Sequence, residues 1–167
     1  MTQLKPISIA GVPAALQKAE RYRLLNDSPA AESICLDILA VDPNNQAAII
    51  TLVLAITDQF ETAESSDALY RAQELIPRIG DPYKRSYYTG IVYERRAKAQ
   101  LHRHVPGAAG MAADWYHRAM DSYEQAEKIR PAGNDESILR WNTCVRMLAK
   151  HEPVHGTRDE YEPALDD

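Results

Sequence analysis

Apolar residues recur along this chain at spacings of three and four residues, which is typical of amphipathic helices, and no segment alternates at the two-residue spacing of a strand. Short breaks rich in proline, asparagine, aspartate and serine separate the periodic segments. The pattern predicts seven helices, over about 13–25, 29–41, 46–59, 65–80, 82–105, 111–130 and 135–150. Because the breaks are short, consecutive helices are expected to pack as antiparallel hairpins, and the fold class is predicted to be all-α.

The breaks contain residues that start and stop helices. Ser28-Pro29 and Asp81-Pro82 each place a capping side chain before a proline, which fits the first turn of a helix because its missing N–H has no partner there. We expect Ser28 to accept one of the unpaired N–H groups of its helix. Pro43 and Pro131 follow helical segments and are expected to end them.

Small and large residues alternate in a way that recurs along the chain. The small ones would let two helices approach closely, and the large ones would fill the space between neighbouring hairpins. The positions concerned are Ala19 and Tyr22, then Ala31, Cys35, Ile38 and Pro43, then Gly90 and Tyr93, and finally Ala119, Tyr123, Ala126 and Pro131.

These spacings resemble the tetratricopeptide repeat, a 34-residue helical hairpin. The resemblance divides the chain into units at about 12–45, 46–81 and 82–133, with Ile49, Leu52 and Ile56 in the first helix of the middle unit and 135–150 as a capping helix. It implies one domain over residues 1–150, built as a right-handed solenoid of about three antiparallel hairpins plus the capping helix. Residues 151–167 would form an acidic C-terminal tail.

The same resemblance implies a binding groove. Members of the family bind extended peptides or helices in a concave groove lined by the first helix of each unit. Members that hold the acidic C-terminus of chaperones use Lys, Arg and Asn there, but Leu16 and Glu20 occupy two of those places, so a hydrophobic or amphipathic partner segment is expected instead. The groove residues would be Leu16, Glu20, Arg23, Ile50, Leu54, Thr57, Lys84, Tyr87, Ile91 and Glu94.

The third hairpin is longer than the repeat pattern. Tyr93 and Ala119 stand 26 residues apart where the pattern allows nine, and only Pro106 to Gly110 has turn chemistry, so both helices are predicted to be about two turns longer. Its apolar residues are Leu101, Val105, Met111, Trp115 and Tyr116. Two outcomes stay open: the hairpin is a contact surface for another copy or a partner subunit, or Leu101 packs on Trp115 and the hairpin folds over the preceding unit.

Charge is distributed unevenly. The net charge of −5 argues against nucleic acid as the partner, yet 82–105 carries six basic residues against Glu94 alone. That helix is either a solvated face or a surface for an acidic partner. The tail is acidic, and it could dock on the basic helix of its own chain or of a neighbour, with Tyr161 and Leu165 as anchors.

No catalytic motif occurs, and the five histidines do not converge at metal-ligand spacing, so no catalytic residue, metal or cofactor is expected. Neither a signal peptide nor a membrane span is apparent, and Cys35 and Cys144 read as buried thiols, so the expected compartment is the cytoplasm. The predicted function is a non-catalytic adaptor or assembly factor that binds a protein segment in the groove. The alternative is a permanent subunit of a homo-oligomer or of a larger enzyme complex, docked through the extended third hairpin.

Overall fold

A computed structural model describes residues 2–62, 65–103 and 105–151, and within these ranges the chain forms helices and no strand. The prediction of an all-α fold is thus confirmed for this part of the chain. The α-helices are α1 (Val12–Leu24), α2 (Ser28–Val41), α3 (Gln46–Thr57), α4 (Ser65–Leu75), α5 (Pro82–Leu101), α6 (Ala108–Lys128) and α7 (Glu136–His151). Two short 3-10 turns, η1 (Ile9–Gly11) and η2 (Ile76–Arg78), precede α1 and follow α4.

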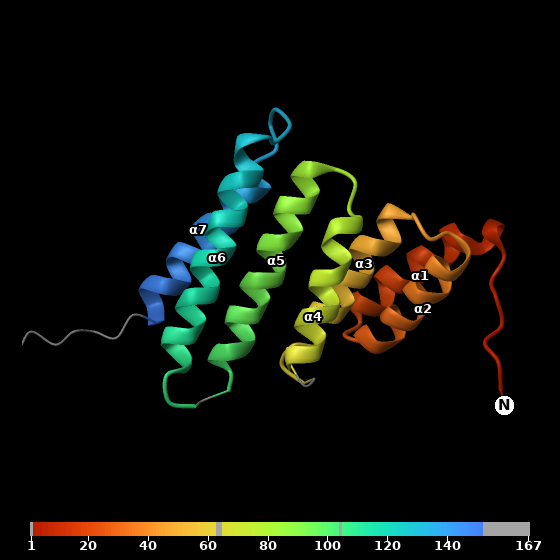
Figure 1. Ribbon diagram of the computed structural model, residues 1–167, viewed down its shortest axis with the longest axis horizontal. Helices are drawn as coiled ribbons and strands as arrows, with labels where there is room; N and C mark the ends of the chain where they lie inside the picture. The colour runs from red at the N-terminus through yellow and green to blue at the C-terminus, as the bar shows by residue number, and fades with distance from the viewer. Residues whose placement is uncertain (1, 63–64, 104, 152–167) are drawn as a thin grey trace, which may run out of the picture.

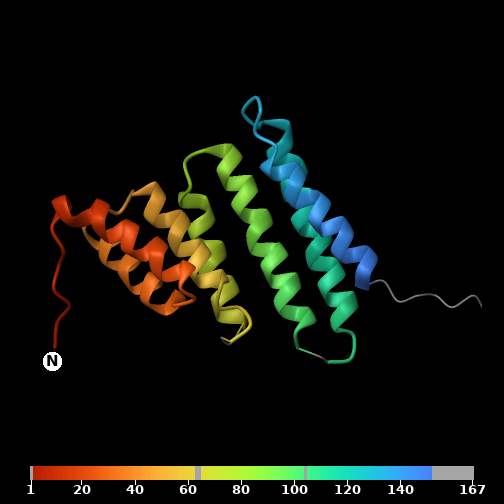
Figure 2. The ribbon, with the colours of Figure 1, turned by 180° about the vertical axis from the view of Figure 1, so that it is seen from behind.

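The helices pack in chain order and form two layers (Figures 1 and 2). Each helix packs on the next one along the chain, and α3 also contacts both α1 and α5. In Figure 1 α4 and α6 lie nearer the viewer, whereas α3 and α7 are nearer in the reverse view of Figure 2. The odd-numbered helices therefore form one layer and the even-numbered helices the other.

The core consists of adjoining apolar clusters. The largest lies among α1 to α4, with further members from η2 and α5, and includes the residues Ala19, Ala31 and Cys35 of the repeat pattern. A second lies among α5, α6 and α7 and includes Ala119 and Tyr123. The half-buried side chains of Tyr88 and Tyr93 pack against both clusters, so α5 joins the two halves of the molecule.

Helix α2 begins differently from the expectation. The carboxylate of Asp27, and not the hydroxyl of Ser28, caps the helix by accepting the N–H of Ala30 at 3.2 Å. Ser28 is buried instead, and its hydroxyl donates to the carboxylate of Asp58, just after α3, at a distance of 3.3 Å. At α5 the predicted arrangement is present, since Asp81 accepts the N–H of Lys84 at 3.0 Å ahead of Pro82.

The third hairpin is built from two long helices, as its sequence predicted. Helices α5 and α6 have 20 and 21 residues, whereas α1 to α4 have 13, 14, 12 and 11. Helix α6 begins at Ala108, three residues before the expected Met111, because Gly107 adopts a left-handed conformation with φ of 80° and ends the turn early. The extra residues thus lengthen the helices rather than the loop.

Candidate protein-binding surfaces

The ten predicted groove residues all lie on α1, α3 or α5, on the layer that we call the odd-helix face. Two of them are exposed, Glu20 and Lys84, and six are half-buried, namely Leu16, Arg23, Ile50, Leu54, Tyr87 and Glu94. The remaining two, Thr57 and Ile91, are buried with 3% and 2% of their surface exposed, so their assignment to a binding groove is wrong. Thr57 is covered because its hydroxyl accepts from Arg95 at 2.6 Å, and Ile91 packs into the cluster shared with α6.

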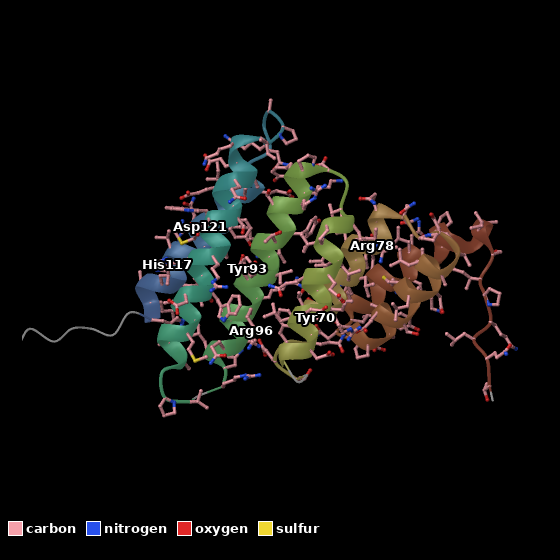
Figure 3. The ribbon with its side chains drawn as sticks, in the orientation of Figure 1. Tyr70, Arg78, Tyr93, Arg96, His117 and Asp121 are labelled. Carbon is pink, nitrogen blue, oxygen red and sulfur yellow. The ribbon has the colours of Figure 1, made fainter. Side chains whose placement is uncertain are left out.

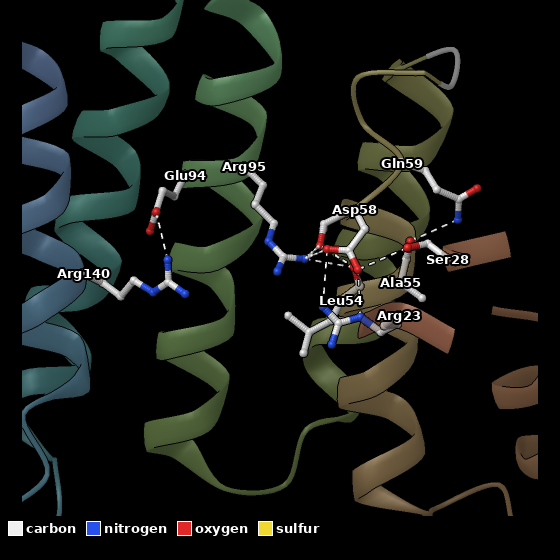
Figure 4. A network of polar contacts seen from close by, with 10 residues as sticks. Arg23, Ser28, Leu54, Ala55, Asp58, Gln59, Glu94, Arg95 and Arg140 are labelled. Atoms are coloured by element: carbon white, nitrogen blue, oxygen red, sulfur yellow. Dashed lines mark hydrogen bonds and ion pairs between the residues drawn. The ribbon is translucent and has the colours of Figure 1, made fainter. Parts of the chain in front are cut away.

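Ion pairs cross the odd-helix face from one helix to the next (Figure 4). The carboxylate of Asp58, just after α3, accepts from Arg23 of α1 at 2.8 Å and pairs with Arg95 of α5 at 2.7 Å. Arg95 also donates to the carbonyl oxygen of Leu54 at 2.9 Å. Burial lowers the pKa of Arg95, and the negative charge of Asp58 opposes that change. One carboxylate therefore ties α1, α3 and α5 together.

A second polar link joins α5, α6 and α7. Glu94 accepts from the phenol of Tyr123 at 2.6 Å. It also accepts from Arg140 at 3.1 Å (Figure 4). Burial, reinforced by the adjacent Glu94, raises the pKa of the Tyr123 phenol, so it remains a donor at neutral pH. Glu94 is thus engaged within the fold and is not a free carboxylate for a partner.

Four tyrosines form an aromatic cluster beside these links. Tyr87 stacks on Tyr83 with ring centroids 5.9 Å apart, meets Tyr88 edge-on at 5.2 Å and lies 5.9 Å from Tyr123. Sequence reasoning singled out Tyr87 but missed the cluster, although the spacing of Tyr83 and Tyr87 places them on one side of a helix. The half-buried Ile50 and Leu54 of α3 and Tyr87 of α5 define what we call the apolar patch of the odd-helix face.

The residues expected to form one surface on the third hairpin are separated in the structure. Tyr116 has only 2% of its surface exposed and packs beside Cys144, so its assignment to the contact surface is wrong. Trp115 packs on Tyr93, which is labelled on α5 in Figure 3, with ring centroids 5.6 Å apart. Near the tip, Val105 and Met111 keep 48% and 50% of their surfaces exposed.

Leu101 instead lines an apolar groove, which we call the hairpin groove, between the ends of α5 and α7 and the first half of α6. The groove has a volume of about 490 Å³. Its walls are Leu101, Ala109, Gly110, Ala112, Ala113, Tyr116, His117, Met147, Leu148 and His151. Sequence reasoning missed the α7 wall, although Met147, Leu148 and His151 stand at the spacing of one helix side and could have indicated it.

The basic residues of α5 do not form one continuous cationic surface. Arg95 is occupied by Asp58, and Arg85 donates to the carbonyl oxygen of Ile79 at 2.9 Å. Burial, with nearby Arg103, lowers the pKa of Arg96, which lies on α5 between α4 and α6 in Figure 3. Lys84 and Lys98 are exposed near opposite ends of the helix. Arg85 is also exposed and keeps its charge, and the interpretation of this helix as a surface for an acidic partner stays a prediction.

The described ranges contain no group of three or more His, Cys, Asp or Glu that could hold a metal ion. No helix in these ranges combines the length and apolar character needed to cross a bilayer. Cys35 and Cys144 are both buried free thiols. The predicted tail anchors, Tyr161 and Leu165, lie outside the described residues. Comparison with protein-family models, with curated proteins and with solved structures finds no match for this chain.

Proposed function

We propose that this chain is a non-catalytic protein-binding module of the cytoplasm, an adaptor or assembly factor whose odd-helix face receives a segment of another protein. The tetratricopeptide-like right-handed solenoid belongs to this proposal. The sequential packing of the helices and the burial of the small residues Ala19, Ala31 and Ala119 support it.

The observation that carries the proposal is the apolar patch of Ile50, Leu54 and Tyr87. These side chains remain half-buried on the odd-helix face, although each belongs to or adjoins the apolar core. The links through Asp58 and Glu94 join the four odd-numbered helices to one another. Because these links already hold the helices together, little further ordering of this chain is required on binding. The patch therefore suits the hydrophobic side of a partner helix or extended segment.

Exposed charged groups on the helices of the same face supply a test that leaves the core intact. Glu20 and Lys84 are exposed on α1 and α5, and the salt bridges found in the described ranges do not include them. Affinity purification from the native cell should recover the same partner with the wild type and with the control Leu36→Ser/Tyr70→Ser, whose residues are exposed on α2 and α4. The double variant Glu20→Lys/Lys84→Glu should lose it. Equal recovery with all three proteins would remove the odd-helix face from consideration.

A second candidate function is a permanent subunit docked through the tip of the third hairpin. It is favoured by the exposure of Val105 and Met111, which lie close together in sequence on either side of the turn. Size-exclusion chromatography with light scattering distinguishes the two candidates. A stable dimer that Val105→Ser/Met111→Ser converts to a monomer supports the subunit, whereas a wild-type monomer supports the adaptor.

A further inference from the structure

The hairpin groove lies where the described part of α7 ends alongside α6. Helix α7 has 16 residues and α6 has 21, and the described part of α7 ends at His151, which itself lines the groove. Beyond that point the first turns of α6 present the small residues Ala109, Ala112 and Ala113. Met147 and Leu148 form the opposite wall and are half-buried. The apolar walls favour an occupant with apolar side chains.

The chain itself continues from the wall of this groove. Residues 152–167 follow His151 directly and contain the apolar side chains Val154, Tyr161 and Leu165. At about 3.5 Å per extended residue, three residues of chain reach at most about 10 Å and ten residues at most about 35 Å, which are the limits for Val154 and Tyr161 measured from His151. A short tether of this kind gives an effective concentration on the order of millimolar, so even weak intramolecular binding would fill the groove.

Charge favours the same occupant. The tail carries six acidic residues and one arginine, Arg158. The acidic residues are Glu152, Asp159, Glu160, Glu162, Asp166 and Asp167. Lys98 stands one turn before Leu101 on α5, and Lys150 directly precedes His151 on α7, and both lysines are exposed. Asp114 on α6 is the opposing charge next to the lining residue Ala113. Tail carboxylates would meet these lysines at the groove rim while apolar tail side chains enter it.

We infer that the hairpin groove is the docking site of the chain's own acidic C-terminal tail, residues 152–167, with Val154, Tyr161 and Leu165 as its apolar anchors. The docked tail completes the apolar cover of α6 and α7 at the end of the helical stack. This inference does not depend on the odd-helix face binding a partner, because the groove lies among α5, α6 and α7 and includes no residue of the apolar patch.

Methionine methyl NMR on the full chain tests the inference, since the protein has four methionines and Met147 lines the groove. The wild type is compared with Val154→Ser/Tyr161→Ser/Leu165→Ser, which keeps the length and charge of the tail. His155→Ser/Gly156→Ser/Thr157→Ser is a matched control that changes neither the anchors nor the carboxylates of the tail. A soluble paramagnetic agent reports the exposure of each methyl group, and Met120, which packs in the core cluster of α5 to α7, serves as the internal reference.

We expect the Met147 methyl resonance to shift and its paramagnetic relaxation to increase severalfold in the anchor variant, while the control variant behaves as the wild type and Met120 is unchanged in all three. A Met147 methyl group that is equally open to the agent in the wild type and the anchor variant would overturn the inference. A methyl group that stays shielded in both, together with a dimer in light scattering, would also overturn it and assign the groove to a second copy of this chain.

Discussion

The ring of Tyr123 in α6 lies directly against the backbone of Gly90 in α5. A Cβ atom at position 90 would stand 2.6 Å from Cδ1 and 2.8 Å from Cζ of that ring, closer than real Cβ contacts allow. Tyr123 is fully buried, and its phenol donates to Glu94 one turn further along α5. The absence of a side chain at Gly90 therefore sets how closely the two longest helices approach, and the ring fills the space left by it.

The first prediction concerns this contact. Gly90→Ala should lower the free energy of unfolding by about 1–3 kcal/mol, or more, because the new methyl group must displace a buried ring. The matched control is Gly110→Ala on α6, where an added Cβ meets nothing within 4 Å. That change should raise the free energy of unfolding by about 0.5–1 kcal/mol through the lower flexibility of alanine. Urea denaturation measures both, and equal effects at the two glycines would contradict the packing described.

Tyr123 supplies the second prediction. Tyr123→Ala should destabilise the protein by about 3–5 kcal/mol, as expected for a large aromatic side chain removed from a packed core. Tyr123→Phe keeps the ring and removes only the donor to Glu94, so it should cost about 1–3 kcal/mol. A loss below about 1 kcal/mol for the alanine variant, measured by chemical denaturation, would mean that the ring is not packed as observed.

The hairpin of α5 and α6 shows what the sequence could predict. The absence of a breaker from Arg95 to Val105 and the turn residues at 106–110 predicted two long helices, over about 82–105 and 111–130. Both helices are long in the structure, but α5 ends at Leu101, four residues earlier than predicted, and α6 begins at Ala108. The repeat-like spacing predicted that Gly90 and Ala119 let two helices approach closely, and both residues are buried. Tyr123 was expected to fill the space between neighbouring hairpins, and it is buried against Gly90 within one hairpin. Periodicity and residue size determine such local contacts, so one sequence suffices to predict them.

The exposure of single side chains on a known helix was predicted less well. Thr57 and Tyr116 were placed on binding surfaces, and both are buried by partners distant in sequence, Arg95 in the first case and α7 in the second. The links of Asp58 and Glu94 were not predicted either, because they join helices whose relative rotation no local pattern specifies. For a side chain with both polar and apolar parts, partners distant in sequence decide whether it lies on the surface or in the core.

Asp58 is the subject of the third prediction. Asp58→Asn should lower the free energy of unfolding by about 1–3 kcal/mol, because Arg23 and Arg95 would lose the charged partner that they share. Glu61→Gln is the matched control, since the His102–Glu61 pair is about half exposed and should contribute at most about 1 kcal/mol. If thermal denaturation shows equal losses for the two variants, Asp58 does not brace the odd-helix face.

The fourth prediction concerns alkaline pH. Burial raises the pKa of the Cys35 and Cys144 thiols from 9.0 to about 12, so both stay protonated in the folded protein after the unfolded chain has begun to ionise. The contribution to stability is complete below pH 9 and is lost as the pH rises from about 9 toward 12. Urea denaturation at pH 8, 9 and 10 should show this fall. Cys35→Ala/Cys144→Ala should reduce the slope, and an unchanged slope would assign it to other groups.

The buried thiols also give a kinetic expectation. At pH 8 a small alkylating reagent should modify Cys35 and Cys144 of the folded protein far more slowly than those of the urea-unfolded chain, because the thiols are both inaccessible and protonated. Mass spectrometry of the alkylated protein over time follows the reaction. Rapid modification of either thiol without denaturant would show that its helix opens readily.

Site-specific photo-crosslinking in the native cell tests the central claim, that the odd-helix face binds a protein partner, most directly. A photoreactive amino acid replaces Glu20 or Lys84 on that face, and Leu36 or Tyr70 on the other layer, all four positions being exposed. The account predicts that the same partner is crosslinked from positions 20 and 84 and not from 36 or 70. A partner crosslinked from 36 or 70 alone, or no crosslink from any of the four, would contradict it.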